Sequence, residues 1–223
     1  MNTVKESENT VKILDDRFYL VDEMWFPSVT TILSVYPKGH HLNQWIAENG
    51  LDSKRLKMIA GAKGSLVHKS IEKLMAGQQL SLGDYEEDEW RCLIAFQNFW
   101  LDYKPELIEA EHPVMSKRLK YAGTLDAALK IDDKLIRVDW KTGNHLYEEH
   151  DIQLVAYEMA EREAGKKAAD DLWLIQLGTR TKKGYSLHKV TDWSMKDIGF
   201  QICLKLWNFA HPNAKPFDKN LPI

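Results

Sequence analysis

The second half of the chain alternates short apolar runs with turn residues, a pattern typical of β-strands. Three such runs follow one another closely: ELIEAEHPVMS (106–116), YAGTLDAALKI (121–131) and KLIRVDWK (134–141). A helical pattern then ends near Gly165, DLWLIQLG and YSLHKV predict two more strands, and DWSMKDIGFQICLKLWNFA predicts a closing amphipathic helix. A helix between the third and fourth strands implies a crossover that makes those two strands parallel. We therefore expect an α/β fold built around a mixed β-sheet.

The first hundred residues show mainly helical periodicity. FYLVDEMWF predicts a short hairpin, and Pro27 is placed to start a helix through SVTTILSVY. HLNQWIAENG predicts a helix that ends at Gly50. The stretch SKRLKMIAGAKGSLVHKSIEKLMAG predicts helices broken near positions 61–64, and DYEEDEWRCLIAFQNFWLDY predicts a further helix.

The polar pair Asp132-Asp133 is a natural two-residue turn between the second and third strands. Centring the hairpin there places Asp126 opposite Asp139, with Lys141 on the same face because strand side chains repeat every two residues. Two carboxylates would then face each other at about 4.5–5.5 Å between Cβ atoms, which destabilises a hairpin unless something compensates. A divalent cation would compensate. A register shifted by one residue would separate the two acids.

An isolated Asp-x-Lys on a strand is most often a solvated face with an incidental ion pair. This chain adds further polar groups in order. A histidine lies in KGSLVHKSIEKL after a glycine-rich stretch, and Gln153 and Tyr157 stand four apart on one helical face. The presence of these polar groups beside the Asp-x-Lys strand favours a functional site over a solvated surface.

Composition sets the frame for such a site. The chain has 223 residues, of which 44% are hydrophobic, enough to bury a sizeable core, and we expect one compact domain. Residues 1–105 would form an N-terminal hairpin and helical region that includes the His68 helix, and 106–223 the core. Two cysteines far apart favour a reducing interior, and no membrane span or signal peptide is evident, so we expect a cytoplasmic protein. The net charge of −3 neither favours nor excludes a nucleic-acid partner.

Four segments of the chain resemble, in their order, the motifs of the PD-(D/E)XK nuclease superfamily in its RecB-like branch. They are GSLVH with its histidine, GTLD, VDWKTG and QLVAY. That branch includes phage exonucleases and the mitochondrial genome maintenance exonuclease. The motifs cover roughly residues 60–160, and FPSVTTIL resembles the N-terminal segment of these members. The resemblance implies an αβββαβ restriction-endonuclease-like core at 106–223. Members with an iron–sulfur cluster use four cysteines, so with two we expect no cluster.

The resemblance also implies roles for individual residues. Asp126 and Asp139 would bind Mg²⁺ or Mn²⁺ through hard oxygen atoms, His68 would add an imidazole, and Trp140 would add its backbone carbonyl. Lys141 would position or help to deprotonate the attacking water and offset charge on the phosphorus.

Further positions are less defined. A turn near residues 118–119 would bring the strand EAEHPV alongside Asp126, so Glu111 could add a carboxylate at a second metal position, although Glu109 has the same parity. Gln153 and Tyr157 are expected to orient the metal-site loop or to contact the DNA backbone, and Tyr157 could equally belong to the core. Basic tracts near strand ends place Lys120, Arg180 and Lys182 as candidate DNA contacts.

These implications predict a metal-dependent DNA nuclease, an exonuclease on single-stranded or end-frayed DNA, that hydrolyses phosphodiester bonds with a metal-activated water. One alternative is an endonuclease for flap or branched DNA, and another is a catalytically silent DNA-binding module. The phage-like resemblance favours DNA recombination or repair in a bacterial host cytoplasm.

Overall fold

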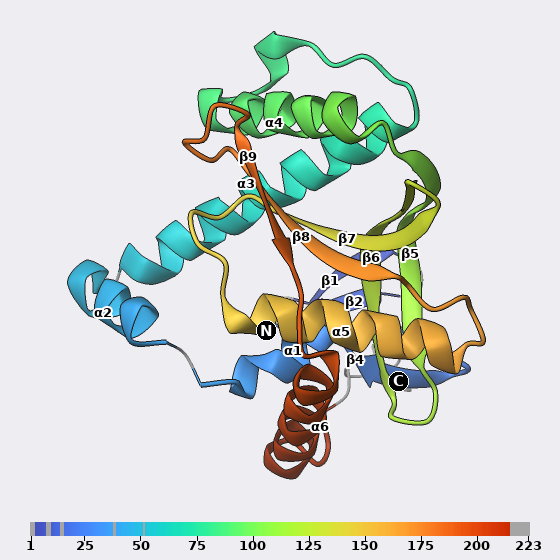
Figure 1. Cartoon of the computed structure of the whole chain (residues 1–223). Coiled ribbons are helices and arrows are strands. Elements are labelled where there is room, and N and C mark those ends of the chain that lie inside the picture. The colour runs from blue at the N-terminus through green and yellow to red at the C-terminus, as the bar shows by residue number, and fades with distance from the viewer. Residues whose placement is uncertain (1–2, 8–9, 14–15, 38, 51, 215–223) are drawn as a thin grey trace, which may run out of the picture.

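The computed structural model describes residues 3–7, 10–13, 16–37, 39–50 and 52–214. Its central sheet has five strands in the order β5-β6-β7-β8-β9 (Figure 1). Strands β7 and β8 are parallel, and the other neighbours are antiparallel. The predicted mixed α/β sheet is therefore confirmed. The strands are β5 (Glu106–Ser116), β6 (Tyr121–Ile131), β7 (Lys134–Lys141), β8 (Asp171–Leu177) and β9 (Tyr185–Lys189).

The β6–β7 hairpin has the predicted register. Ile131 pairs with Lys134 across the turn, and the ladder continues to Ala127 and Val138. Both turn residues have positive φ, 49° at Asp132 and 63° at Asp133, as a type I′ turn requires. The next positions in this register are Asp126 and Asp139, where the ladder between the two strands ends.

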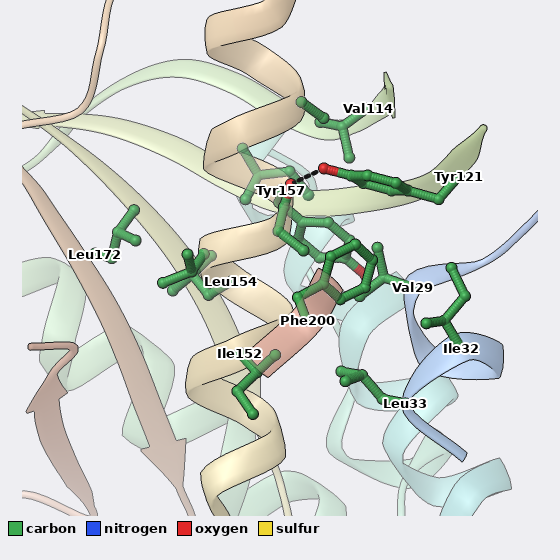
Figure 2. Packing of buried hydrophobic residues seen from close by; sticks show 14 of the residues in the cluster. Val29, Ile32, Leu33, Val114, Tyr121, Ile152, Leu154, Tyr157, Leu172 and Phe200 are labelled. Carbon is green, nitrogen blue, oxygen red and sulfur yellow. Dashed lines mark hydrogen bonds between the residues drawn. The ribbon is translucent and has the colours of Figure 1, made fainter. Parts of the chain in front are cut away.

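Helices cover both faces of the sheet. One core includes residues of α5 (Glu148–Glu163), α6 (Trp193–Ala210) and α1 (Val29–Ile32), and Figure 2 shows the packing among these helices. A second core, on the opposite face, joins α3 (Asp52–Met75) and α4 (Glu87–Tyr103) to alternate residues of β6, β7 and β8. Each core draws on residues from both sides of position 105. Within the described residues, no helix is both long enough and apolar enough to cross a membrane.

The N-terminal region contains a sheet that the sequence revealed only in part. The predicted hairpin is present as β3 (Asp16–Val21) and β4 (Met24–Pro27), but β1 (Thr3–Ser7) and β2 (Thr10–Ile13) extend it to four antiparallel strands. The helix expected after Pro27 is short. Pro27 ends β4, and Ser28 caps α1 by accepting a hydrogen bond from the Thr31 amide before a 3₁₀ turn, η1 (Leu33–Val35). The helix α2 (His40–Asn49) ends at Gly50, as predicted, with φ at 51°.

The predicted break near positions 61–64 is wrong, because α3 runs without interruption through Gly61 and Gly64. Glycine inside a helix costs only about 1 kcal/mol relative to alanine, an amount that packing easily offsets. At Gly64, a Cβ atom would lie 3.2 Å from Thr142 Oγ1. The small residue there allows α3 to approach the end of β7. A 3₁₀ turn, η2 (Leu82–Asp84), precedes α4.

Candidate metal and catalytic site

Two buried carboxylates lie where β6 and β7 separate. Asp126 and Asp139 are both buried, on adjacent strands at the end of their ladder. The Asp126 side chain replaces the missing backbone bond, since its Oδ2 accepts a hydrogen bond of 2.8 Å from the Trp140 amide. The hairpin thus uses a side chain of the site to tie its two strands together.

A histidine from α3 and a second acid from β5 complete a cluster. His68 Nδ1 lies 3.3 Å from Asp126 Oδ1. Glu111 comes from the strand on the other side of β6, between the pairs Ala110–Ala127 and His112–Leu125. Ligand atoms of His68, Glu111 and Asp126 all lie within 4.8 Å of one another.

Glu111 has an unusual backbone. Its φ of 45° lies in the left-handed region, which costs about 1–2 kcal/mol for a residue with a side chain. Such conformations gather at functional sites. Its sequence neighbour of the same parity, Glu109, instead bonds to Lys166 Nζ at 2.9 and 3.0 Å. Of the two acids that the sequence left open, Glu111 is the one beside Asp126.

The cluster formed by Glu109, His112 and Glu161 has ligand-like spacing too. An ammonium group already lies among its members, because Lys166 Nζ is 2.7 Å from His112 Nε2 and 3.3 Å from Glu161. Arg137 adds a second cation, with Nη1 3.1 Å from Glu161 Oε2. This group is therefore an ion-pair network already neutralised by the protein's own cations.

A chain of polar contacts leads from Asp139 into α5. Lys141 Nζ lies 2.7 Å from Asp139 Oδ2 and donates a hydrogen bond of 3.1 Å to Gln153 Oε1. Gln153 Nε2 in turn donates to the Tyr157 hydroxyl at 2.9 Å. Gln153 and Tyr157 lie on one helical face, as predicted. Their hydrogen bond orients the Gln153 amide that accepts from Lys141.

Glycine in the GTLD motif makes room for that tyrosine. A Cβ atom on Gly123 would lie 2.4 Å from Tyr157 Cε1, far inside van der Waals contact. The tyrosine ring is 4% exposed and belongs to the core. Tyr157 therefore has no surface for the predicted contact with DNA, and its position is that of a residue orienting Gln153. Gly123 was not predicted to have a role, although it stands three positions before Asp126 in the GTLD motif.

Burial and opposing charges give the cluster unequal proton affinities. Burial raises the pKa of Asp126, but the adjacent His68 outweighs it and the net pKa is lowered. Burial lowers the pKa of His68, yet Asp126 raises it further, to about 9. Burial and the Asp126 charge raise the pKa of Glu111 to about 7. For Asp139, burial dominates, Lys141 opposes it, and the pKa rises to about 6.

The donor set fits a divalent cation. One imidazole and two carboxylates converge in the cluster, with Asp139 on the adjacent strand, and such a mixed set suits Mn²⁺ and accommodates Mg²⁺. The raised pKa of His68 shows that the protein itself favours positive charge at this point. A metal ion bound there would supply the positive charge that the carboxylates favour, and the imidazole would release its proton.

A cleft of about 340 Å³ lies beside the end of β7. Its lining includes Thr142, Gly143 and Asn144, which directly follow Lys141. Lys63 from α3 and Arg91 from α4 line the same cleft. These two basic residues were not predicted from the sequence, because only the fold brings their helices to the end of β7.

The predicted DNA contacts are exposed but lie outside the cluster. Lys120 is in the turn before β6, about 20 Å along the strand from Asp126 at 3.3 Å per residue. Arg180 and Lys182 are in the loop after β8. This loop begins at the same end of the sheet as Lys141, because β7 and β8 are parallel and both finish there. Trp140 presents only its backbone to the site, since its indole is buried against Phe96 and Phe99.

No family model and no curated protein matches this chain. Among solved structures, one described as "Crystal structure of SSO0001" is similar over 80% of this chain and 83% of that chain. The TM-score of that match is 0.36, and the sequence identity is 13%. A likeness this distant carries no argument about fold or function.

Proposed function

We propose that this protein is a metal-dependent DNA nuclease, an exonuclease on single-stranded or end-frayed DNA, with the αβββαβ core of the PD-(D/E)XK superfamily. The observation that carries the proposal is the convergence of His68, Glu111 and Asp126 within 4.8 Å, beside the Asp139–Lys141 pair. Metal ligands and a lysine side by side can activate a water molecule and stabilise the charge that develops during phosphodiester hydrolysis.

In this proposal the ligands come from three elements. His68 on α3, Glu111 on β5 and Asp126 on β6 hold the cation, with Asp139 and the backbone carbonyl of Trp140 as further oxygen donors. A bound Mg²⁺ or Mn²⁺ would supply Lewis acidity and lower the pKa of a coordinated water.

The remaining residues bind, orient and offset charge. Lys141, held by Gln153, places an ammonium group where a scissile phosphate would approach. It would stabilise negative charge as it develops on the phosphate oxygen atoms. Lys63 and Arg91 in the adjacent cleft, with Arg180 and Lys182 on the neighbouring loop, would contact the phosphate backbone.

The test is cleavage of end-labelled linear single-stranded DNA with Mn²⁺, Mg²⁺ or EDTA. We expect metal-dependent degradation that falls by at least about a hundredfold in Asp139→Asn and in Lys141→Ala. Asp133→Asn is the matched control, because Asp133 is in the turn of the same hairpin and its side chain is 93% exposed. Equal cleavage by all four proteins would place the chemistry elsewhere and contradict the proposal.

Circular single-stranded DNA separates the modes of action. An exonuclease needs a free end and leaves the circle intact, whereas an endonuclease opens it. Metal-dependent binding with no cleavage of linear, circular or flap DNA would instead identify a silent DNA-binding module.

A further inference from the structure

Helix α6 is apolar on two sides. Its inner side contributes Phe200, Cys203, Leu204 and Trp207 to the core. Its outer side exposes five large apolar residues, 48 to 84% exposed, which we call the α6 stripe: Met195, Ile198, Ile202, Leu206 and Phe209. The helix lies at the lower edge of the molecule in Figure 1, and no other element that the structure describes covers this side. Contiguous exposed apolar surface of this kind marks an interaction site.

The spacing of the stripe is symmetric. Successive members are three, four, four and three positions apart, so the pattern reads the same in both directions. At 100° per residue, all five fall within an arc of about 80° on the helix surface. A two-fold axis through Ile202 would pair Met195 with Phe209 of a second copy and Ile198 with Leu206. Such mutual pairing is the defining property of an isologous interface.

We propose that the α6 stripe is the interface of a homodimer in which the α6 helices of two copies pack antiparallel. Five large side chains from each copy, 48 to 84% exposed, would bury an area near the lower limit for a specific interface, about 1,200 Å² in total. The dimer is therefore a weak one. The inference does not depend on the nuclease function.

Charge distribution agrees with self-association. Along α6, Lys205 is the charged residue with an exposed side chain, whereas Lys196 and Asp197 are half-buried. The two-fold axis would offset the two copies of Lys205 by about 9 Å along the helix, at 1.5 Å per residue. That offset is close to one screening length, so repulsion is small. A membrane-surface helix would instead oppose its apolar side with a lysine- and arginine-rich side, and the opposite side of α6 is core.

Sedimentation velocity tests the proposal on the full chain. We expect the apparent mass to rise from 25.9 kDa toward twice that value between about 1 and about 100 µM, the range for a weak interface. Ile202→Asp places two carboxylates face to face on the two-fold axis and should keep the protein monomeric. Asn208→Asp adds the same charge at an exposed position outside the stripe and should leave the dimer intact. A monomer at every concentration, with or without binding to anionic vesicles, overturns the proposal, as does a dimer that Ile202→Asp does not change.

Disulfide trapping tests the orientation independently. A mixture of Met195→Cys and Phe209→Cys should form a crosslinked dimer on oxidation, and Met195→Cys alone should not. The native Cys92 and Cys203 are buried and do not compete. Crosslinking of Met195→Cys with itself would show a parallel pair and contradict the antiparallel interface.

Discussion

Tyr157 packs so closely against Gly123 that only glycine fits at position 123, since a Cβ atom there would lie 2.4 Å from the tyrosine Cε1. We expect Gly123→Ala to lower the free energy of unfolding by about 1–3 kcal/mol, because the buried ring cannot move aside without disturbing the core. Urea unfolding measures the change. Gly61→Ala is the control with the opposite sign. Its Cβ meets nothing within 4 Å on α3, so it should stabilise the protein by about 0.5–1 kcal/mol.

The Tyr157 hydroxyl should matter for Lys141 as well as for stability. In Tyr157→Phe, Gln153 loses its acceptor, which costs about 1–2 kcal/mol and releases the amide that holds the lysine. Tyr121→Phe is matched, because it also removes a buried hydroxyl that bonds to α5, at the Ala156 carbonyl (Figure 2), but it does not contact Lys141. We expect both variants to lose similar stability and only Tyr157→Phe to lose DNA cleavage. Equal cleavage by the two would remove the positioning role.

The buried Arg137 should be a main contributor to stability. Its side chain is 2% exposed and pairs with Glu158 and Glu161 of α5. Arg137→Leu leaves these two buried carboxylates with only Arg162 and Lys166, both partly exposed, as cationic partners, so it should cost about 3–5 kcal/mol in the free energy of unfolding. Lys130→Ala breaks an exposed ion pair with Asp133 on the same sheet and should change stability far less. Chemical denaturation of the two variants checks this order, and similar losses would contradict it.

Stability without metal should fall as the pH rises. The pKa of Asp139 is raised to about 6 and that of Glu111 to about 7, so the folded state favours their neutral forms, and this contribution is lost as each deprotonates. The raised pKa of His68, about 9, contributes stability below its unfolded value that disappears as the pH passes about 9. All three groups act in the same direction, whereas Asp126, whose pKa is lowered, contributes stability that is lost only as the pH falls below the ordinary range of an aspartate.

Metal should reverse that trend, because cations bind the deprotonated ligands. We expect Mn²⁺ at a hundred times its Kd at pH 8 to stabilise the protein by about 2.7 kcal/mol at that pH, and the same concentration to stabilise it far less near pH 5, where the ligands are protonated. Thermal unfolding in EDTA and in Mn²⁺ at both pH values measures the effect. An increment independent of pH, or one that survives Asp126→Asn, would show that the metal binds elsewhere.

The sequence predicted the features that depend on local chemistry. The turn at Asp132-Asp133 set the register of β6 and β7, and with it the positions of Asp126 and Asp139, because two residues with positive φ fit one turn type. The crossover before β8 followed from a helix between two strands. Both features follow from residues close in sequence and do not depend on contacts between distant parts of the chain.

What the sequence left open depends on tertiary packing. Glu109 and Glu111 have the same strand parity, but Glu109 pairs with Ala128 and bonds to Lys166, whereas Glu111 has a positive φ and lies beside Asp126. The core position of Tyr157 was undecided because α5 lies between the sheet and α6, so that nearly all its sides are buried and periodicity gives no direction. The strands β1 and β2 have only five and four residues, so each is at the lower limit of length at which alternation indicates a strand.

During folding, the β6–β7 hairpin should form before α3 docks on the sheet. Its two acids are joined by a tight turn and thirteen positions of chain, and such local hairpins form within about 1–10 µs. His68 lies 58 positions before Asp126, so its arrival requires closure of a far longer loop and docking of α3. During that interval the nascent hairpin would hold its two carboxylates together without the imidazole. If the site holds a metal as proposed, a divalent cation would offset the repulsion between these two carboxylates before any substrate is present.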